Sequence, residues 1–178
     1  MDSQAGLSAA ELMAAYNERR ISLGLDLGHG RKLIQEMPLE VWESQMGPRP
    51  RYWSPTLDAL GAVFLIGLAC SVVTALFAWR WYVGLVMIPL SLACAVRMTG
   101  FPHPRPWAYL AIAVLGITIM LVWKVQLLPI VVLLLAIFAS QLSYYLVGYW
   151  IRSYAARNER AFSSLVAVGI LQIGPPSP

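Results

Sequence analysis

Charged residues are scarce in this sequence, and so are cysteine and histidine. Charged side chains make up 12% of the 178 residues, whereas an ordinary soluble domain carries roughly a quarter. That shortage, together with 58% hydrophobic residues, excludes a water-soluble monomer. The cysteines, Cys70 and Cys94, lie in apolar segments at unequal depths, so we expect no disulfide between them. The histidines, His29 and His103, lie outside the apolar segments and cannot ligate a haem or chlorophyll at mid-membrane.

Ionisable residues are also missing from the interior of the apolar segments. Asp58 is the only acidic residue within them, and it lies near the start of the first, where a helix dipole favours it. A membrane enzyme or proton-coupled carrier usually places charged groups deeper, because their insertion is costly unless function requires them. The sequence also has no nucleophile elbow, zincin helix or metal-ligand spacing. We therefore expect a protein that is not an enzyme, with no catalytic residue, no metal site and no intrinsic cofactor.

Long apolar runs are what the sequence does have. Breaks at charged or proline-rich positions divide the block into four predicted transmembrane helices, 57–79, 81–96, 107–123 and 127–151. The second is the shortest, and Pro89 near its middle predicts a kink. Six of the seven tryptophans lie at the predicted span ends, where amphipathic rings prefer the headgroup level: Trp53, Trp79, Trp81, Trp107, Trp123 and Trp150.

The distribution of lysine and arginine predicts the orientation. Six basic residues precede the first span, two lie in the connection 97–106 and three follow the last span, whereas the other side carries only Arg80 and Lys124. The positive-inside rule then places both termini in the cytoplasm, which in a bacterium means the inner membrane. No apolar stretch follows the first residues, so we expect no cleavable signal peptide. The fold prediction is an all-α integral membrane protein with four transmembrane helices in two tight hairpins.

The regions outside the membrane are predicted to be a cytoplasmic arm, 1–53, and a tail, 152–178, flanking the transmembrane region 54–151. In the arm we expect short amphipathic helices at 9–20 and from Pro38 to Gly47, and between them an extended run ending in a turn at 28–30. Leu39 and Trp42 are candidates for docking on a partner, or for packing on this chain's own helices. The apolar segment 161–173 is too short to span and is predicted to be interfacial or docked, with a re-entrant loop less favoured.

Small residues repeat along two of the predicted spans. Close approach of helix backbones in lipid uses such residues, so these positions are candidate packing sites: Gly67, Ser71 and Ala75 in the first span, and Ala136, Ser140 and Gly148 in the fourth. Gln141 is the most polar side chain at depth, and a buried amide needs a partner on another helix. That helix belongs either to this chain or to a neighbouring subunit.

The leading functional hypothesis is a non-catalytic accessory or scaffold subunit of a larger membrane complex, energy-transducing or transporting. Its partners would be membrane lipids and other transmembrane subunits, with bound lipid or pigment on its helix surfaces. The arm carries similar numbers of acidic and basic residues, so we expect no nucleic acid partner. Two alternatives remain. The paired hairpins resemble reticulon-like membrane-shaping proteins in layout, and Gln141 with its neighbouring tyrosines could line a small oligomeric channel.

Overall fold

The computed structural model describes residues 11, 14–16, 18, 22–78, 85, 88–91, 93, 105–123 and 127–174. Most of these residues are helical. The chain divides into two compact units, of which unit 1 comprises Met1–Ser54 with Leu146–Pro178 and unit 2 comprises Pro55–Tyr145. Each unit is described separately below.

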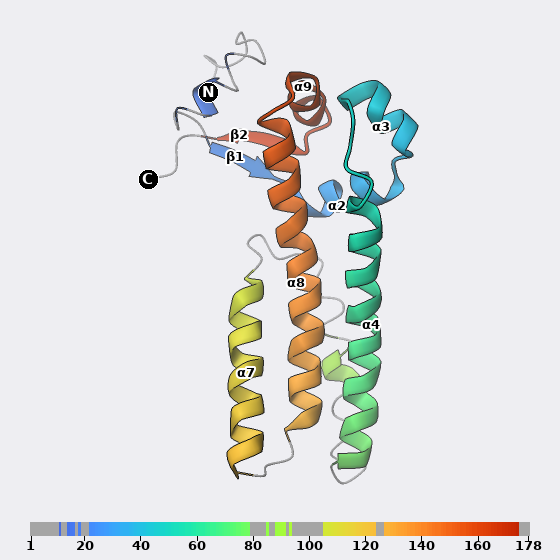
Figure 1. Ribbon diagram of the computed structural model, residues 1–178, viewed down its shortest axis with the longest axis vertical. Coiled ribbons are helices and arrows are strands. Elements are labelled where there is room, and N and C mark those ends of the chain that lie inside the picture. Colours follow the sequence, from blue (N-terminus) through green and yellow to red (C-terminus); the bar gives the residue numbers. More distant parts are fainter. Residues whose placement is uncertain are drawn as a thin grey trace. The chain divides into compact units, whose positions relative to one another are not determined.

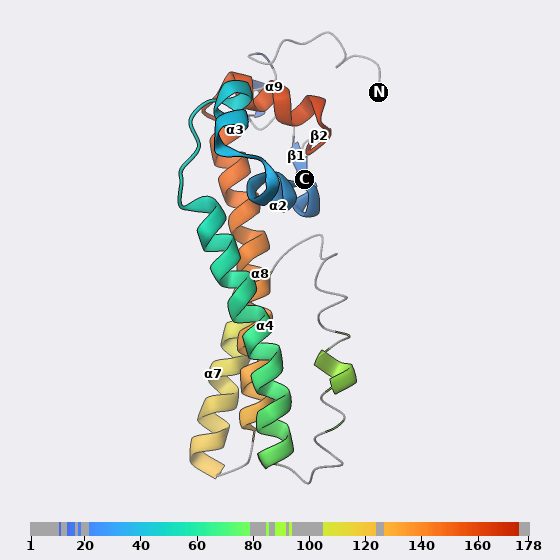
Figure 2. The same cartoon turned by 90° about the vertical axis from the view of Figure 1, so that its right-hand side faces the viewer.

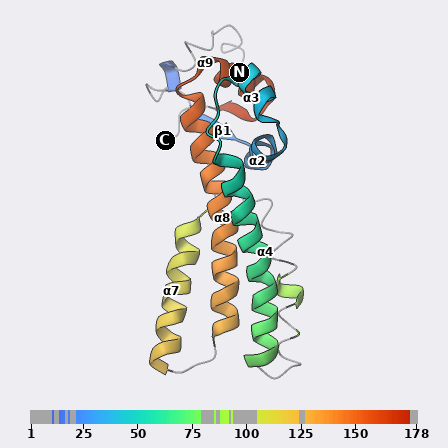
Figure 3. The ribbon, with the colours of Figure 1, turned by 45° about the vertical axis from the view of Figure 1, so that its right-hand side comes forward.

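Among the described residues, three long helices contribute to unit 2. They are α4 (Trp53–Ala78), α7 (Pro106–Trp123) and the first part of α8 (Leu128–Ala155), and within this unit α8 lies between α7 and α4 (Figures 1 and 3). Two helices, Trp53–Phe77 and Leu128–Ala155, are long and apolar enough to cross a membrane. This confirms the prediction of membrane-length apolar helices. The predicted span 81–96 lies largely outside the described residues, as do the two predicted hairpin turns.

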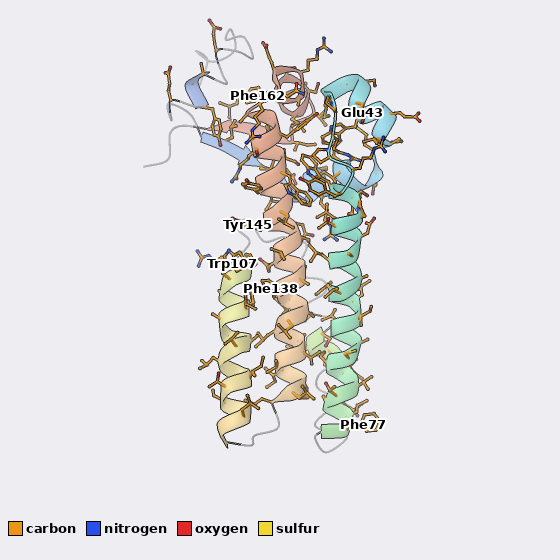
Figure 4. All side chains as sticks on the ribbon, in the orientation of Figure 1. Glu43, Phe77, Trp107, Phe138, Tyr145 and Phe162 are labelled. Carbon is orange, nitrogen blue, oxygen red and sulfur yellow. The ribbon has the colours of Figure 1, made fainter. Side chains whose placement is uncertain are left out.

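The core of unit 2 forms where α4 and α8 approach each other. Its buried members are Leu68 and Ala75 from α4 and Leu133, Ala136 and Ile137 from α8. Phe64 and Val72 of α4 and Tyr109 of α7 pack around this core. Apolar side chains on the other faces of α4 are exposed, and Phe77 projects away from the helices (Figure 4).

Unit 1 contains a small sheet that the all-α prediction did not include. Strand β1 (Ser22–Leu25) pairs antiparallel with β2 (Leu171–Gly174), with Leu23 opposite Ile173 and Leu25 opposite Leu171. These apolar pairs share one face because side chains alternate along a strand, and Gly24 and Gln172 share the other. The alternating leucines predicted the extended run, but its partner comes from the opposite end of the chain.

The turn predicted at residues 28–30 is wrong, because these residues form the first turn of α2 (Leu27–Glu36). Asp26 caps this helix, its side chain accepting a hydrogen bond from the backbone N–H of His29. Gly30 is buried, and a Cβ added there would lie 2.7 Å from Cδ1 of Ile151. The glycine that suggested a turn is therefore a site of close packing between α2 and α8.

Helix α3 (Leu39–Met46) begins after Pro38 and ends at Gly47. Gly47 has a φ of 94°, and a Cβ there would lie 2.7 Å from Nδ2 of Asn158, so both backbone and space require glycine. Helix α9 (Glu159–Ala167) follows its N-cap residue Asn158 and packs beside α3 (Figure 2). The apolar tail segment predicted at 161–173 is thus divided between α9 and β2, and both contact other elements of unit 1.

Candidate functional site

The predicted packing residues of the first and fourth spans lie in different environments. Gly67 of α4 faces Ala136 of α8, and a Cβ on Gly67 would lie 2.7 Å from the Ala136 Cβ and 3.3 Å from its Cα. Ala75 is buried in the same core. Gly148, by contrast, faces Leu27 of α2 in unit 1, whose Cδ2 would lie 3.2 Å from an added Cβ. The small residues therefore serve contacts between helices of this chain.

Two buried hydroxyl groups of unit 2, those of Ser71 and Ser143, donate to carbonyl oxygens of their own helices. The Ser71 Oγ donates to the carbonyl oxygen of Leu68 at 2.7 Å and lies 3.4 Å from the Ser91 Oγ. The Ser143 Oγ donates to the carbonyl oxygen of Ser140 at 2.7 Å, and Ser140 itself is buried. A serine that bonds back to the preceding turn is easily accommodated in an apolar helix.

Gln141 is 1% exposed and has a partner within this chain. Its Oε1 accepts a hydrogen bond from the backbone N–H of Arg105 at 3.2 Å, just before α7 begins. Near this end of α7, the ring centroids of Trp107 and Phe138 lie 6.2 Å apart (Figure 4). The amide therefore joins α8 to the start of α7.

An aromatic cluster in unit 1 was not predicted. We call it the tryptophan cluster; it contains Trp42, Tyr52, Trp53, Trp150 and Tyr154, with Arg49 beside it. Trp53 and Trp150 stack with centroids 5.3 Å apart and planes 4° apart, and Trp42 meets Trp53 edge to face at 6.1 Å. Trp53 and Trp150 were predicted at the same side of the membrane, a signal that could have suggested their contact.

Trp42 lies within the tryptophan cluster and is fully buried, whereas Leu39 is half-buried. Trp42 also contacts Tyr154, with centroids 5.9 Å apart. Of the two alternatives considered for Trp42, docking on a partner or packing on its own chain, the structure shows the second. Its ring is enclosed by residues of this chain.

Hydrogen bonds join the end of α3 to the start of α9. The carbonyl oxygen of Met46 accepts from Nδ2 of Asn158 at 2.7 Å and from the Tyr154 hydroxyl at 3.1 Å. The Oδ1 of Asn158 accepts from the backbone N–H groups of Arg160 and Ala161. One asparagine side chain thus caps α9 and holds α3 against it.

Arg49 is a buried cation in the described part of unit 1. It is 9% exposed, its guanidinium carbon lies 5.0 Å from the centre of the Trp42 ring, and its Nη1 donates to the Ile34 carbonyl oxygen at 2.7 Å. Burial lowers the pKa of Arg49, and the electrostatic interaction with Glu43 acts in the opposite direction. An arginine guanidinium stays charged at neutral pH.

At the start of α2, the pKa of Asp26 is lowered. The main cause is the hydrogen bond from the backbone N–H of His29, and the His29 side chain adds to it, with Nδ1 lying 2.8 Å from Oδ2 of Asp26. Both side chains are substantially exposed. The pair therefore acts as a helix cap.

The described part of the chain holds no group of three or more histidine, cysteine, aspartate or glutamate side chains placed to bind a metal. Comparisons with known protein families, with curated proteins and with solved structures find no significant match. What the chain does must therefore be inferred from its own residues.

Proposed function

We propose that this chain is an integral membrane protein that acts as a non-catalytic accessory or scaffold subunit of a larger membrane complex. The observation that carries the proposal is the exposure of α4. In its most apolar stretch only 17% of the residues are buried within the protein, against 56% in α8. Burying a large aliphatic or aromatic side chain is worth about 1.5–3 kcal/mol. An apolar environment, lipid or another subunit, is thus needed around α4.

Helix length supports complete crossing of the bilayer. At about 1.5 Å per residue, the 26 residues of α4 and the 28 of α8 give roughly 39 and 42 Å. Both exceed the hydrocarbon thickness of about 30 Å. A reticulon-like hairpin that enters only one leaflet has no need of such lengths, so they weigh against the membrane-shaping alternative.

We propose four crossings with both termini in the cytoplasm. Helix α7 has 18 residues and carries Trp107 and Trp123 at its ends, as a third span would. We propose that the predicted span 81–96 is the second crossing. An even number of crossings then agrees with the excess of basic residues on one side.

The polar contacts at depth favour a scaffold over a channel. The Gln141 side chain, which would line a path in the channel alternative, is engaged by the backbone of Arg105 and is almost fully buried. The small residues Gly67 and Ala136 pack against each other. The outward apolar surface of α4, including Leu65, Ile66 and Phe77, is left for lipid and for a partner subunit.

Photocrosslinking tests the scaffold proposal. A photoreactive residue is introduced at Leu65 or Ile66, which are 65% and 62% exposed on α4, and at Ser163 on α9 as an exposed polar control. We expect both α4 positions, and not the control, to crosslink to one discrete polypeptide in native membranes. An absorption spectrum of the gently extracted complex then shows whether it carries pigment. Adducts with lipid alone, and a lone 19.7 kDa chain after extraction, would refute the scaffold role.

A further inference from the structure

Three buried side-chain nitrogens have no hydrogen-bond partner among the described residues, and all three belong to the tryptophan cluster or to the arginine beside it. They are Nε1 of Trp42, Nε of Arg49 and Nε1 of Trp53. The guanidinium of Arg49 lies against the Trp42 ring, and the Trp42 ring lies against Trp53. The unpaired N–H groups are thus concentrated in one place.

These groups can only donate hydrogen bonds. An indole offers one N–H and a guanidinium offers five, and neither has an acceptor. The carbonyl oxygen of Ile34 accepts a hydrogen bond from Nη1 of Arg49, and the Tyr154 hydroxyl donates to the carbonyl oxygen of Met46. A buried donor without an acceptor is destabilising, and more so when it is charged. The chemistry that would satisfy this set is an anion with several oxygen atoms.

The surroundings favour phosphate oxygens. Arg49 is followed by the exposed Arg51 and Tyr52, and Trp53 is the first residue of the apolar stretch Trp53–Phe77. Tryptophan and arginine at the end of a membrane helix lie at the level of lipid headgroups, where phosphate is the abundant acceptor. Arginine binds phosphate through charge-assisted hydrogen bonds.

We propose that Arg49 and the indole N–H groups of Trp42 and Trp53 bind a phosphate group, that of an anionic phospholipid. The proposal rests on the membrane placement of α4 proposed above. The three nitrogens are shielded in this structure, so the headgroup displaces a covering side chain. Tyr52, which is 58% exposed and packs edge-on against Trp150, is the most exposed ring of the cluster.

Native mass spectrometry of the full chain in a neutral detergent tests the site. Phosphatidylglycerol or phosphatidylcholine is added, and the variants are Arg49→Gln and, as control, Arg51→Gln, which makes the same charge change at an exposed position. Loss of one charged hydrogen-bonding group weakens binding about tenfold or more. We expect one phosphatidylglycerol per chain, bound in preference to phosphatidylcholine, with that loss in Arg49→Gln and less than about twofold change in Arg51→Gln.

Variants that keep an aromatic ring at each position distinguish a loss of binding from a loss of folding. Trp42→Phe and Trp53→Phe remove an N–H and retain an aromatic ring, so each is expected to weaken binding while leaving the melting temperature close to that of the parent chain. Glu43→Gln should tighten binding, because Glu43, on α3 (Figure 4), acts electrostatically on Arg49 and would repel an anion. In the unaltered chain, ¹⁵N spectra should show the two indole N–H resonances, assigned from these variants, moving on addition of phosphatidylglycerol.

A second arm replaces the lipid with inorganic phosphate in the same detergent. Saturable phosphate binding that Arg49→Gln abolishes, without selective lipid binding, would support the oxyanion chemistry and identify free phosphate as its source. Equal lipid retention in Arg49→Gln and Arg51→Gln, or indole resonances that do not move with either ligand, would overturn the site. Both arms are carried out in detergent solution, so their result is separate from whether α4 carries a partner subunit in the membrane.

Discussion

The contact between Gly67 and Ala136 makes a quantitative prediction about how α4 packs on α8. Alanine is favoured over glycine in a helix by about 1 kcal/mol, so Gly67→Ala on a free helix would be stabilising. Here the new Cβ would lie 2.7 Å from the Cβ of Ala136 and 3.3 Å from its Cα. Neither atom can rotate away. Overpacking of this kind costs about 1–3 kcal/mol, which leaves a net destabilisation of about 0–2 kcal/mol.

Removing the Ala136 methyl group should reverse the sign of the stability change that Gly67→Ala causes. In an Ala136→Gly background the 2.7 Å contact disappears and only the 3.3 Å contact with the Cα remains, so Gly67→Ala should become neutral or stabilising because its helix preference is no longer opposed by the methyl group. The double-mutant cycle should then show a coupling free energy of about 1–3 kcal/mol. Unfolding of the four proteins in one detergent, followed by circular dichroism, measures it.

Gly116→Ala in α7 is the matched comparison. The nearest atom to its new Cβ is a Val131 methyl at 3.1 Å, and that methyl can shift by rotation of its side chain. We expect a smaller loss than for Gly67→Ala. If Gly67→Ala has the same effect with alanine or glycine at position 136, the helix contact described here does not exist in the folded protein.

Two further predictions concern unit 1. Asn158→Ala should cost about 2 kcal/mol, roughly one for the α9 cap and one for the bond to Met46, whereas Asn158→Ser keeps a cap and should lose about half as much; a Ser variant as stable in thermal unfolding as the parent chain would exclude the contribution of the Met46 bond. The lowered pKa of Asp26 means that its stabilising effect is present above its unfolded pKa of about 3.9 and is lost as the pH falls through the folded value. Asp26→Asn, which can still cap, should therefore flatten the decline of melting temperature below pH 4, and an unchanged acid profile would contradict the assignment.

Composition and periodicity were enough to predict membrane-length apolar helices, because twenty or more apolar residues in sequence leave few alternatives. Their ends were less predictable. Helix α4 begins at Trp53, four residues before the predicted start, because Pro55 is tolerated in a first turn. Asp58 accordingly lies beyond the first turn. Helix α8 continues to Ala155, which is fully buried in unit 1.

Contacts between residues far apart in the sequence determine the structural features that local sequence patterns did not predict. Gly28 and Gly30 are typical of a turn, yet Asp26 caps a helix there and Gly30 fits against Ile151 and Val147. The pairing of Leu23 with Ile173 joins opposite ends of the chain, and local sequence carries no record of such a partner. The tryptophan cluster likewise draws on three separate segments: α3, the start of α4 with the residue before it, and the end of α8.

The central claim is that the apolar helices cross a bilayer and return the chain to the side from which it started. It is tested most directly by single cysteines at Arg80, Lys124 and Ser163, in a chain whose Cys70 and Cys94 are replaced by alanine, treated with an impermeant thiol reagent on intact cells. We expect labelling at 80 and 124 from outside, and at 163 only after the membrane is permeabilised. Labelling of position 163 together with 80 and 124 on intact cells, failure of 80 and 124 to label until the membrane is permeabilised, or release of the chain by alkaline washing, would contradict the account.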